Sequence, residues 1–537
     1  MTFKQATYAI RVALVSISSL CFFASVGSAA SYYVDATSGV DSNPGSISAP
    51  LKTVTKVNSM SLSPGDSVFF KRGGAWDTLL KPVSGTSGAP VSYGAYGSGN
   101  KPLIRGFYAS SKSYVVAQDI EFKNGGADSP VTLLTSHHIA IRNCDLYADT
   151  TNTCWAAVYV LLNSHHNEIS GCNVAHRNLK RQSDAINLRR NANYNLIKNN
   201  RIGIATHYSL SLEGFDTANP TYACNYNIIQ NNIIYNPEGA TMGLQSNSSN
   251  NVVEGNTIYG GKSTSYDANL PRSMKNVSRN NIIRYNIIRD NTPATASGLG
   301  MEVYAYTTDP PNVATGNHVY NNVITNIAKY PLVIATNGDA GAAAFNNNFK
   351  NNAVYNNAPV SGYQLWIMKH ATIYDNFFSN NLFYKAGVST IMNVQGKYTS
   401  VAGIQTSDPS HFQGNVQLDP KLDASFRPLL GSPCIDGGDF LTKVTSASGT
   451  GTVLAVATAG YFSDGLGIAK GDTIKVGSST AVITAVDRAT NRITVAEPVT
   501  WKTGDPVSLP YSGAKPDIGA VEYEQIVAQP LDLKFTN

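Results

Sequence analysis

The 537-residue chain has a formal net charge of +5, and only 14% of its residues are charged. Such a mild positive charge argues against nucleic acid or a membrane surface as a partner. Hydrophobic residues make up 42% of the chain, but no long apolar run follows the first 30 residues. We therefore expect a soluble chain that does not enter a membrane.

Residues 1–30 have the pattern of a secretory signal peptide. Lys4 and Arg11 are the charged residues of this segment, an apolar run follows them, and the segment ends in GSAA. This order predicts cleavage near Ala29 or Ala30 and a secreted protein, either extracellular or periplasmic. Without Lys4 and Arg11 the formal charge falls from +5 to +3.

Residues 31–110 differ in composition from the rest of the chain. Turns rich in Pro, Gly and Ser flank a short helical stretch at Val54–Met60 and a strand at Asp66–Lys71. We expect this segment to be an N-terminal cap with the first strands, because a stack of strands otherwise ends in an unpaired edge.

An eight-residue motif then recurs along the chain. NLIKNNRI at residues 195–202 returns as NIIQNNII at residues 227–234, and related octads follow at spacings of 24 to 36 residues. Repeats at such spacings are typical of solenoids, in which each unit buries its apolar face against the next. The nine octads start at Ile139, Asn167, Asn195, Asn227, Asn251, Asn281, Asn317, Asn347 and Asn376.

The octad predicts an all-β fold, a right-handed parallel β-helix over residues 111–440. Its third and eighth positions are apolar, and each run is too short for a helix. In stacked coils, equivalent positions lie about 4.8 Å apart, so sixth-position side chains can hydrogen-bond as an Asn ladder. The predicted ladder contains Asn200, Asn232, Asn256, Asn286, Asn322, Asn352 and Asn381, and Cys144 and Cys172 extend it.

Five cysteines remain after the leader, an odd number that leaves at least one unpaired. Cys144 and Cys172 occupy the same position of adjacent octads. Neighbouring parallel strands suit a disulfide poorly, so we expect a reduced Cys–Cys step in the ladder. No cysteine has the spacing of a zinc site.

Residues 441–512 lack the octad but alternate apolar and polar residues between turn signals. This pattern predicts a small inserted antiparallel β module. Residues 513–537, which begin near KPDIGAVEY, are expected to return to the main body and end in a tail.

The strand before each octad sets the outward-facing positions, because side chains alternate along a strand. Counting back from the octads predicts two outward columns beside each other. Long loops flank them, and a groove between such loops suits a linear polymer. One column reads Tyr159, Asn187, Ser211, Gly243, Ser273, Glu302 and Trp366, and the other reads Leu161, Arg189, Glu213, Gln245, Lys275, Tyr304 and Met368.

The two ends of the chain resemble a known family. YYVDATSGVDSNPG, APLKTV and LSPGDSVFFKRGGAW resemble the N-terminal cap of secreted bacterial β-helix proteins of the pectate lyase-like superfamily. SPCIDGG and KPDIGAVEY resemble the C-terminal end of those proteins. The family includes polysaccharide lyases, glycoside hydrolases, epimerases and tailspike depolymerases. The resemblance therefore implies the fold and a carbohydrate polymer, but not one reaction.

The favoured hypothesis is β-elimination of a uronate-containing polysaccharide by a monomeric enzyme. Lys275 would be the base or charge stabiliser, and Arg189 would bind the substrate carboxylate. Asp184 and Glu213 would orient them or hold Ca²⁺, an arrangement that resembles that of pectate lyases. The chain lacks the clustered aspartates of pectate families, the DPHD run of epimerases and the NTD, DD and GHG blocks of polygalacturonases. The expected substrate-binding residues are Asn187, His207, Glu302, Tyr304, Tyr306 and Trp366.

Two other functions remain open at this point. Asp184 and Glu213 are also the best carboxylate pair for a glycoside hydrolase. A non-catalytic glycan-binding or adhesive solenoid is the third hypothesis. Separately, Arg189 and Glu213 without a chemical role would be a surface ion pair worth under about 1 kcal/mol. An unsaturated product would indicate elimination, and new reducing ends without unsaturation would indicate hydrolysis.

Overall fold

The structure is a computed structural model of the chain. It describes residues 29–124, 126–180, 182–214, 219, 221–236, 238–245, 247–261, 272–276, 278–291, 298–305, 313–357 and 362–524. For residues 272, 273, 275 and 276 it describes the backbone alone. The predicted signal peptide lies outside the described residues, except for Ala29 and Ala30.

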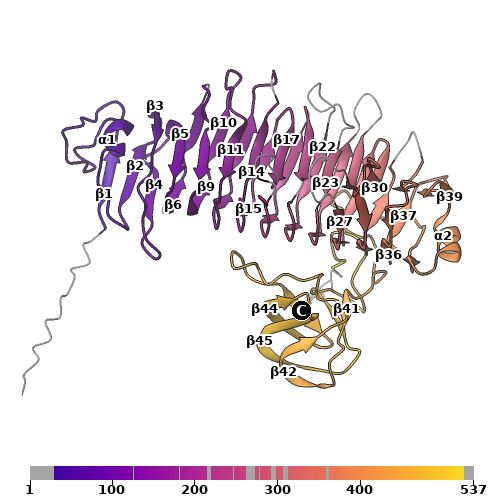
Figure 1. The fold of residues 1–537 in the computed structure, drawn as a ribbon. Helices are drawn as coiled ribbons and strands as arrows, with labels where there is room; N and C mark the ends of the chain where they lie inside the picture. The colour runs from indigo at the N-terminus through magenta and orange to yellow at the C-terminus, as the bar shows by residue number, and fades with distance from the viewer. Residues whose placement is uncertain are drawn as a thin grey trace, which may run out of the picture.

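Parallel coils stack along one axis, from the indigo N-terminal end to the orange end in Figure 1. Each complete coil contributes a strand to each of three columns. Column A is a 14-stranded parallel sheet, which contains the first half of every octad. Its strands are β1 (Ser31–Val34), β2 (Ser67–Lys71), β4 (Val91–Tyr96), β6 (Ser113–Gln118), β9 (His137–Arg142), β12 (Glu168–Ser170), β15 (Leu196–Lys198), β18 (Ile228–Gln230), β21 (Val252–Glu254), β24 (Ile282–Arg284), β28 (His318–Tyr320), β32 (Asn348–Lys350), β36 (Phe377–Ser379) and β40 (Phe412–Gln413).

Columns B and C belong to one 23-stranded sheet. Column B includes the second half of each octad. Its strands are β3 (Ala75–Leu80), β5 (Leu103–Ser110), which also pairs with the first strand of column C, β7 (Glu121–Asn124), β10 (Asp145–Ala148), β13 (Asn173–His176), β16 (Arg201–Gly203), β19 (Ile233–Asn236), β22 (Thr257–Gly260), β25 (Ile287–Asn291), β29 (Val323–Ile327), β33 (Ala353–Tyr355) and β37 (Leu382–Tyr384). Column C precedes the octads: β8 (Val131–Leu134), β11 (Ala156–Leu161), β14 (Asp184–Arg189), β17 (Tyr208–Glu213), β20 (Ala240–Leu244), β23 (Arg272–Asn276), β26 (Leu299–Ala305), β30 (Tyr330–Thr336), β34 (Leu365–Ile367) and β38 (Met392–Val394), with β39 (Lys397–Thr399) antiparallel to β38.

The third and eighth octad positions face the core, as the sequence predicts. Ile197 and Ile202, for example, are fully buried in the main apolar cluster. Between them, the fifth position turns the chain from column A to column B with a positive φ, as at Asn199 and Gly255. Asn and Gly tolerate this left-handed conformation better than other residues do.

The predicted Asn ladder is confirmed. The backbone N–H of Asn200 donates to Oδ1 of Asn232 at 2.9 Å, and Nδ2 of Asn200 donates to the same oxygen at 3.0 Å. The pattern continues coil by coil to Asn381 and then Asn415. The ladder thus satisfies backbone groups that are buried where the strands turn.

The two cysteines extend this ladder as reduced thiols. The backbone N–H of Cys144 donates to Sγ of Cys172 at 3.4 Å, and that of Cys172 donates to Oδ1 of Asn200 at 2.8 Å. The five cysteines of the described residues are buried, and none of them forms a disulfide bond.

A second Asn ladder, not predicted, occupies the first octad position. The N–H of Asn195 donates to Oδ1 of Asn227 at 2.8 Å, and equivalent bonds link the other members. The signal was present in the sequence, since eight of the nine octads begin with Asn. The members are Asn167, Asn195, Asn227, Asn251, Asn281, Asn317, Asn347 and Asn376.

Both ends of the stack are covered. Helix α1 (Val54–Asn58) begins at the side-chain cap of Thr53 and buries Val54 and Val57 at the N-terminal end. Strands β1, β2 and β4 already pair in parallel with column A, so the stacked coils begin well before residue 111. Helix α2 (Val401–Ser407) lies near the other end, where β27 (Val313–Thr315), β31 (Ala343–Phe345) and β35 (Ile373–Tyr374) form a three-stranded parallel sheet.

A separate six-stranded antiparallel half-barrel lies beside the stack, coloured gold in Figure 1. Its strands are β41 (Thr442–Lys443), β42 (Gly449–Ala455), β43 (Thr473–Val476), β44 (Ser479–Asp487), β45 (Arg492–Trp501) and β46 (Pro506–Ser508). Its apolar core is continuous with outward-facing column A residues, Leu196, Ile228, Val252 and Ile282. Arg284 of column A bonds Asp472 of the half-barrel at 2.7 Å.

The segment after the half-barrel returns to the solenoid. Nδ2 of Asn321 donates to the carbonyl oxygens of Asp517 and Gly519, and Ile518 packs with Cys434 against column B. No helix in the described part of the chain is long and apolar enough to span a membrane.

Candidate active site

Strands β14 and β17, in adjacent coils of column C, bring together four of the predicted site residues. Arg189 pairs in register with Glu213, and the Nε atom of Arg189 lies 3.6 Å from Oε2 of Glu213. Asn187 lies two residues before Arg189 and is buried, and Asp184 begins β14. Alternation along the strand predicted the outward positions of Asn187, Arg189 and Glu213, whereas Asp184 has the inward parity of Ile186.

Asp184 is fully buried, and each of its carboxylate oxygens accepts two hydrogen bonds. Oδ1 accepts from Nδ1 of His207 at 2.8 Å and from the backbone N–H of Tyr208 at 2.9 Å. Oδ2 accepts from Nδ2 of Asn187 at 2.7 Å and from the hydroxyl of Ser211. Burial would raise the pKa of Asp184, but His207, Asn187 and Ser211 together lower it below its ordinary value. Asp184 is therefore an ionised group that orients its neighbours.

Glu213 lies near Asp184, but its pKa is shifted in the opposite direction. Its Oε1 accepts a hydrogen bond from Nε2 of Gln245, one coil further on, at 3.0 Å. Burial and the charge of Asp184 raise the pKa of Glu213, although His207 and Arg189 act against this. The side chain keeps 15% of its surface exposed. Two carboxyl groups whose pKa values are pushed in opposite directions are a common basis for acid–base chemistry.

His207 is the residue whose importance the sequence underestimated. It precedes β17, and the favoured sequence-based hypothesis assigned it to substrate binding and Lys275 to the base role. One ligand atom from each of Asp184, His207 and Glu213 lies within 4.8 Å of the others. Because Asp184 accepts the Nδ1 proton, the neutral imidazole has its lone pair on Nε2. Ser211, Gln245 and the amide of Tyr208 complete the site, and no sequence signal beyond their strand positions marked them.

The other predicted site residues lie further along the stack. Glu302 is buried on β26. Tyr304 and Trp366 are half-buried against a small apolar cluster of Leu299, Val333 and Ala335, and the ring of Trp366 stacks on Tyr330. These residues are at least three coils from Glu213. Tyr306 lies outside the described residues.

Lys275 was placed in the wrong outward column. Its backbone pairs with Gly243 and Glu302, in the column of Asn187 and Ser211, and not with Gln245 in the column of Glu213. The strand match used Met274 as the equivalent of Leu244, whereas Met274 pairs with Met242. The offset arises after β23, because Asn276, the partner of Leu244, lies five residues before Asn281, whereas Leu244 lies seven before Asn251. The structure describes the backbone of Lys275 but not its side chain.

The predicted Ca²⁺ ligands do not fit that ion. Ca²⁺ takes about six to eight oxygen ligands. Both oxygens of Asp184 already accept two hydrogen bonds each, and the third member of the cluster, His207, offers a nitrogen. The reaction proposed for this site therefore uses no metal ion.

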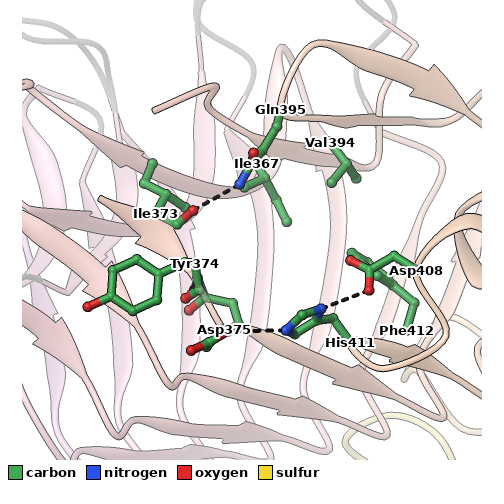
Figure 2. Close-up of a pocket in the computed structure, with 10 residues that line it drawn as sticks. Ile367, Ile373, Tyr374, Asp375, Val394, Gln395, Asp408, His411 and Phe412 are labelled. Atoms are coloured by element: carbon green, nitrogen blue, oxygen red, sulfur yellow. Dashed lines mark hydrogen bonds and ion pairs between the residues drawn. The ribbon is translucent and has the colours of Figure 1, made fainter. Parts of the chain in front are cut away.

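A second histidine–carboxylate group lies at the C-terminal end of the stack (Figure 2). Nδ1 of His411 is 2.8 Å from Asp408, and Nε2 is 3.3 Å from Asp375. Burial would lower the pKa of His411, but the two carboxylates raise it. The group borders a cavity of about 170 Å³ lined by Ile367, Ile373 and Phe412 among others. Both ring nitrogens of His411 face carboxylates, so it is suited to bind a proton and not to remove one.

Comparison with known proteins supports the architecture. Residues 208–349 match the family model described as "Right handed beta helix region". The chain is a right-handed parallel β-helix. No match to a curated protein sequence was found.

Several solved structures are similar to the chain. A mannuronic acid specific polysaccharide family 6 lyase from human gut microbiota is 15% identical, with a TM-score of 0.46 over 73% of this chain and 92% of that one. A pectate lyase is 15% identical, with a TM-score of 0.43 over 92% and 96%. A GH136 lacto-N-biosidase from Eubacterium ramulus is 15% identical, with a TM-score of 0.41 over 72% and 67%. At this level of similarity, the reaction must be argued from the site.

Proposed function

We propose that the chain is a secreted, monomeric carbohydrate-active enzyme that cleaves a uronate-containing polysaccharide by β-elimination on the outer face of column C. The observation that carries the proposal is the Asp184–His207 hydrogen bond of 2.8 Å, with a Glu213 oxygen within 4.8 Å of it. A base, an acid and a cation thus share one small surface. Elimination from a uronate needs these three groups.

Each group has a separate part in the reaction. Arg189 neutralises the uronate carboxylate, and this makes the proton on the adjacent carbon more acidic. Nε2 of His207 removes that proton, while Asp184 stabilises the imidazolium that forms. The electron pair forms a carbon–carbon double bond as the glycosidic carbon–oxygen bond breaks. Glu213, whose raised pKa favours its protonated form, gives its proton to the leaving oxygen.

The base in this proposal is His207 and not Lys275. The variants His207→Gln and Lys275→Ala distinguish the two assignments. We expect the first to lose at least about 10²-fold in turnover, as is typical for loss of a general base, and the second to retain turnover. The reverse result would return the base role to Lys275.

Hydrolysis is the second candidate, and one observation favours it. Asp184 and Glu213 approach within 4.8 Å, close to the separation of about 5 Å in retaining glycosidases. However, a nucleophile must reach the sugar, and Asp184 is fully buried with both oxygens bonded. The geometry therefore supports elimination better than hydrolysis.

The deciding experiment incubates the chain with a panel of uronate polymers, with and without a chelator. Ultraviolet absorption of an unsaturated sugar, unchanged by the chelator, is the expected result. New reducing ends without unsaturation would establish hydrolysis. If no polymer is cleaved but one is bound, the solenoid is a glycan-binding protein and the proposal is wrong.

A further inference from the structure

Two histidine pairs lie at the same turn of adjacent coils, and the proposed reaction uses neither. The sequence SHHI starts at Ser136, and SHHN starts at Ser164. His137 and His165 are bridged in parallel, so the two pairs stack in register. Both pairs are at the edge of column A, whereas the candidate active site is on column C.

The geometry within the two pairs is nearly identical. Nδ1 of His137 is 2.9 Å from Nδ1 of His138, and Nδ1 of His165 is 2.8 Å from Nδ1 of His166. The two rings of each pair are almost perpendicular, at 84° and 85°. A contact this short needs one shared proton, with one Nδ1 donating and the other accepting. Each pair therefore holds two imidazole nitrogens directed at one point.

The same spacing suits a metal ion. Two nitrogens bound at right angles to an ion, each at about 2.0–2.1 Å, lie about 2.9 Å apart. An ion can therefore replace the shared proton after small rotations of the rings. Neutral imidazole is a good ligand for Cu²⁺, Ni²⁺ and Zn²⁺, and Cu²⁺ binds most tightly in this series.

The surroundings hold the rings in place and leave the site accessible. His138 and His166 stack on each other at 5.1 Å, between Tyr114 at 4.7 Å and Tyr194 at 5.3 Å. A surface cavity of about 450 Å³ lies beside the second pair, and its lining includes His165, His166 and Tyr194. Water can thus complete the coordination of an ion.

We propose that His137, His138, His165 and His166 form a surface site for one divalent transition-metal ion, with Cu²⁺ preferred. The rings of His137 and His165 lie 4.9 Å apart, so ions in both pairs at once would repel each other. The first ion is therefore expected to bind much more tightly than a second. This site is independent of the proposed polysaccharide cleavage.

The test is titration of the full chain, made without a polyhistidine tag, with Cu²⁺ in a non-coordinating buffer. Calorimetry should show one tight site, and electron paramagnetic resonance should show nitrogen ligands. The double variant His138→Gln/His166→Gln removes one nitrogen from each pair. It should weaken binding by more than about tenfold, because even indirect partners of a metal are worth 10- to 100-fold in affinity.

Matched variants separate this site from other histidines. His207→Gln and His411→Gln remove imidazoles that bond carboxylates, and both should bind Cu²⁺ like the unmodified chain. If the first double variant does not fold, His137→Gln/His165→Gln provides the same test from the other ring of each pair. Unchanged affinity in either folded double variant would overturn the proposal, as would loss of the tight site in His207→Gln or a spectrum with oxygen ligands alone.

Discussion

Columns A and C have opposite kinds of side chain on their outer faces. The outward residues of column A in four successive coils are Leu196, Ile228, Val252 and Ile282, and the half-barrel buries them. In the same stretch of the stack, column C directs Asn187, Ser211 and Glu213 outward. In the same coils, the outer face of column A is covered by the half-barrel, and the outer face of column C holds the polar cluster.

The two faces contribute differently to the free energy of unfolding. Burying an aliphatic side chain contributes about 1.5–3 kcal/mol, so the covered face of column A stabilises the molecule. A buried polar group costs free energy unless it is hydrogen-bonded. Asp184 meets this requirement with four bonds, but Glu213 remains beside a like charge. The comparison predicts that column C substitutions change turnover more than stability, whereas column A substitutions change stability and leave turnover unaffected.

The largest effect is expected for His207→Gln on column C. Loss of the general base should reduce turnover by about 10²- to 10⁴-fold on any uronate polymer that the chain cleaves. The midpoint of thermal unfolding should fall modestly, because Asp184 loses the charge partner that contributes most to lowering its pKa. His411→Gln is the matched control, because His411 also bonds a carboxylate at 2.8 Å but lies at the C-terminal end. Equal losses in both variants would remove the distinction between the two histidines.

Arg284→Ala is the corresponding substitution on column A. Arg284 is 3% exposed and donates to Glu254, Asp472 and Tyr320. Removing it leaves two carboxylates without their cation, which should cost about 3–5 kcal/mol. Denaturant unfolding measures the loss, while turnover of the remaining folded protein should be unchanged. Arg142→Ala, which breaks an exposed pair with Glu168, should cost under about 1 kcal/mol.

The fold was predictable from the sequence because the same octad occurs nine times, once in each of nine coils. Core positions, the sixth-position ladder and the reduced Cys144–Cys172 step all followed from the octad. The sequence also carried the signal of the second ladder, in the Asn at the first octad position. It carried the signal of the covered face in the apolar residues at the second position. Ile228 and Val252 are apolar where an exposed strand would be polar, and this predicts a covering partner.

The site was less predictable because its members are joined through loops of unequal length. Asp184 and His207 are 23 residues apart, and their contact depends on how the chain enters β14 and β17. Counting back from the octad at Asn195 placed Arg189 directly. It placed Glu213 correctly once the longer segment before the octad at Asn227 was allowed for. The same counting failed at Lys275, because the segment between its strand and the octad at Asn281 is two residues shorter than in the preceding coil.

Removal of the half-barrel tests whether column A depends on its cover. Strands β41 and β46 pair with each other, so the two ends of residues 441–512 are close and a short Gly–Ser linker can join them. We expect the solenoid to remain folded and to unfold cooperatively, but at a lower temperature. The uncovered face, which includes Ile228, should also bind a hydrophobic dye. Loss of the cooperative transition would show that the half-barrel is part of the cap.

The smallest change in thermal stability is expected for Glu213→Gln, and the sign of that change is informative. Burial and Asp184 raise the pKa of Glu213, so the folded chain holds this proton more tightly than the unfolded chain does. The resulting stabilisation is fully present below the ordinary value of 4.5 and is lost as pH rises through the folded pKa. At neutral pH, Glu213→Gln should therefore raise the unfolding midpoint slightly, by about 1–2 °C for a domain of this size. The gain should vanish below pH 4.5.

Asp184→Asn is the matched variant with the opposite sign. The pKa of Asp184 is lowered in the folded chain, so its contribution is present above the ordinary value of 3.8 and is lost as pH falls through the folded pKa. This variant should lower the midpoint at neutral pH, because the donors of His207, Asn187 and Ser211 lose a charged acceptor. If both variants shift the midpoint in the same direction, the two carboxyl groups are not held in different states. The assignment of Glu213 as the acid beside an ionised Asp184 would then fail.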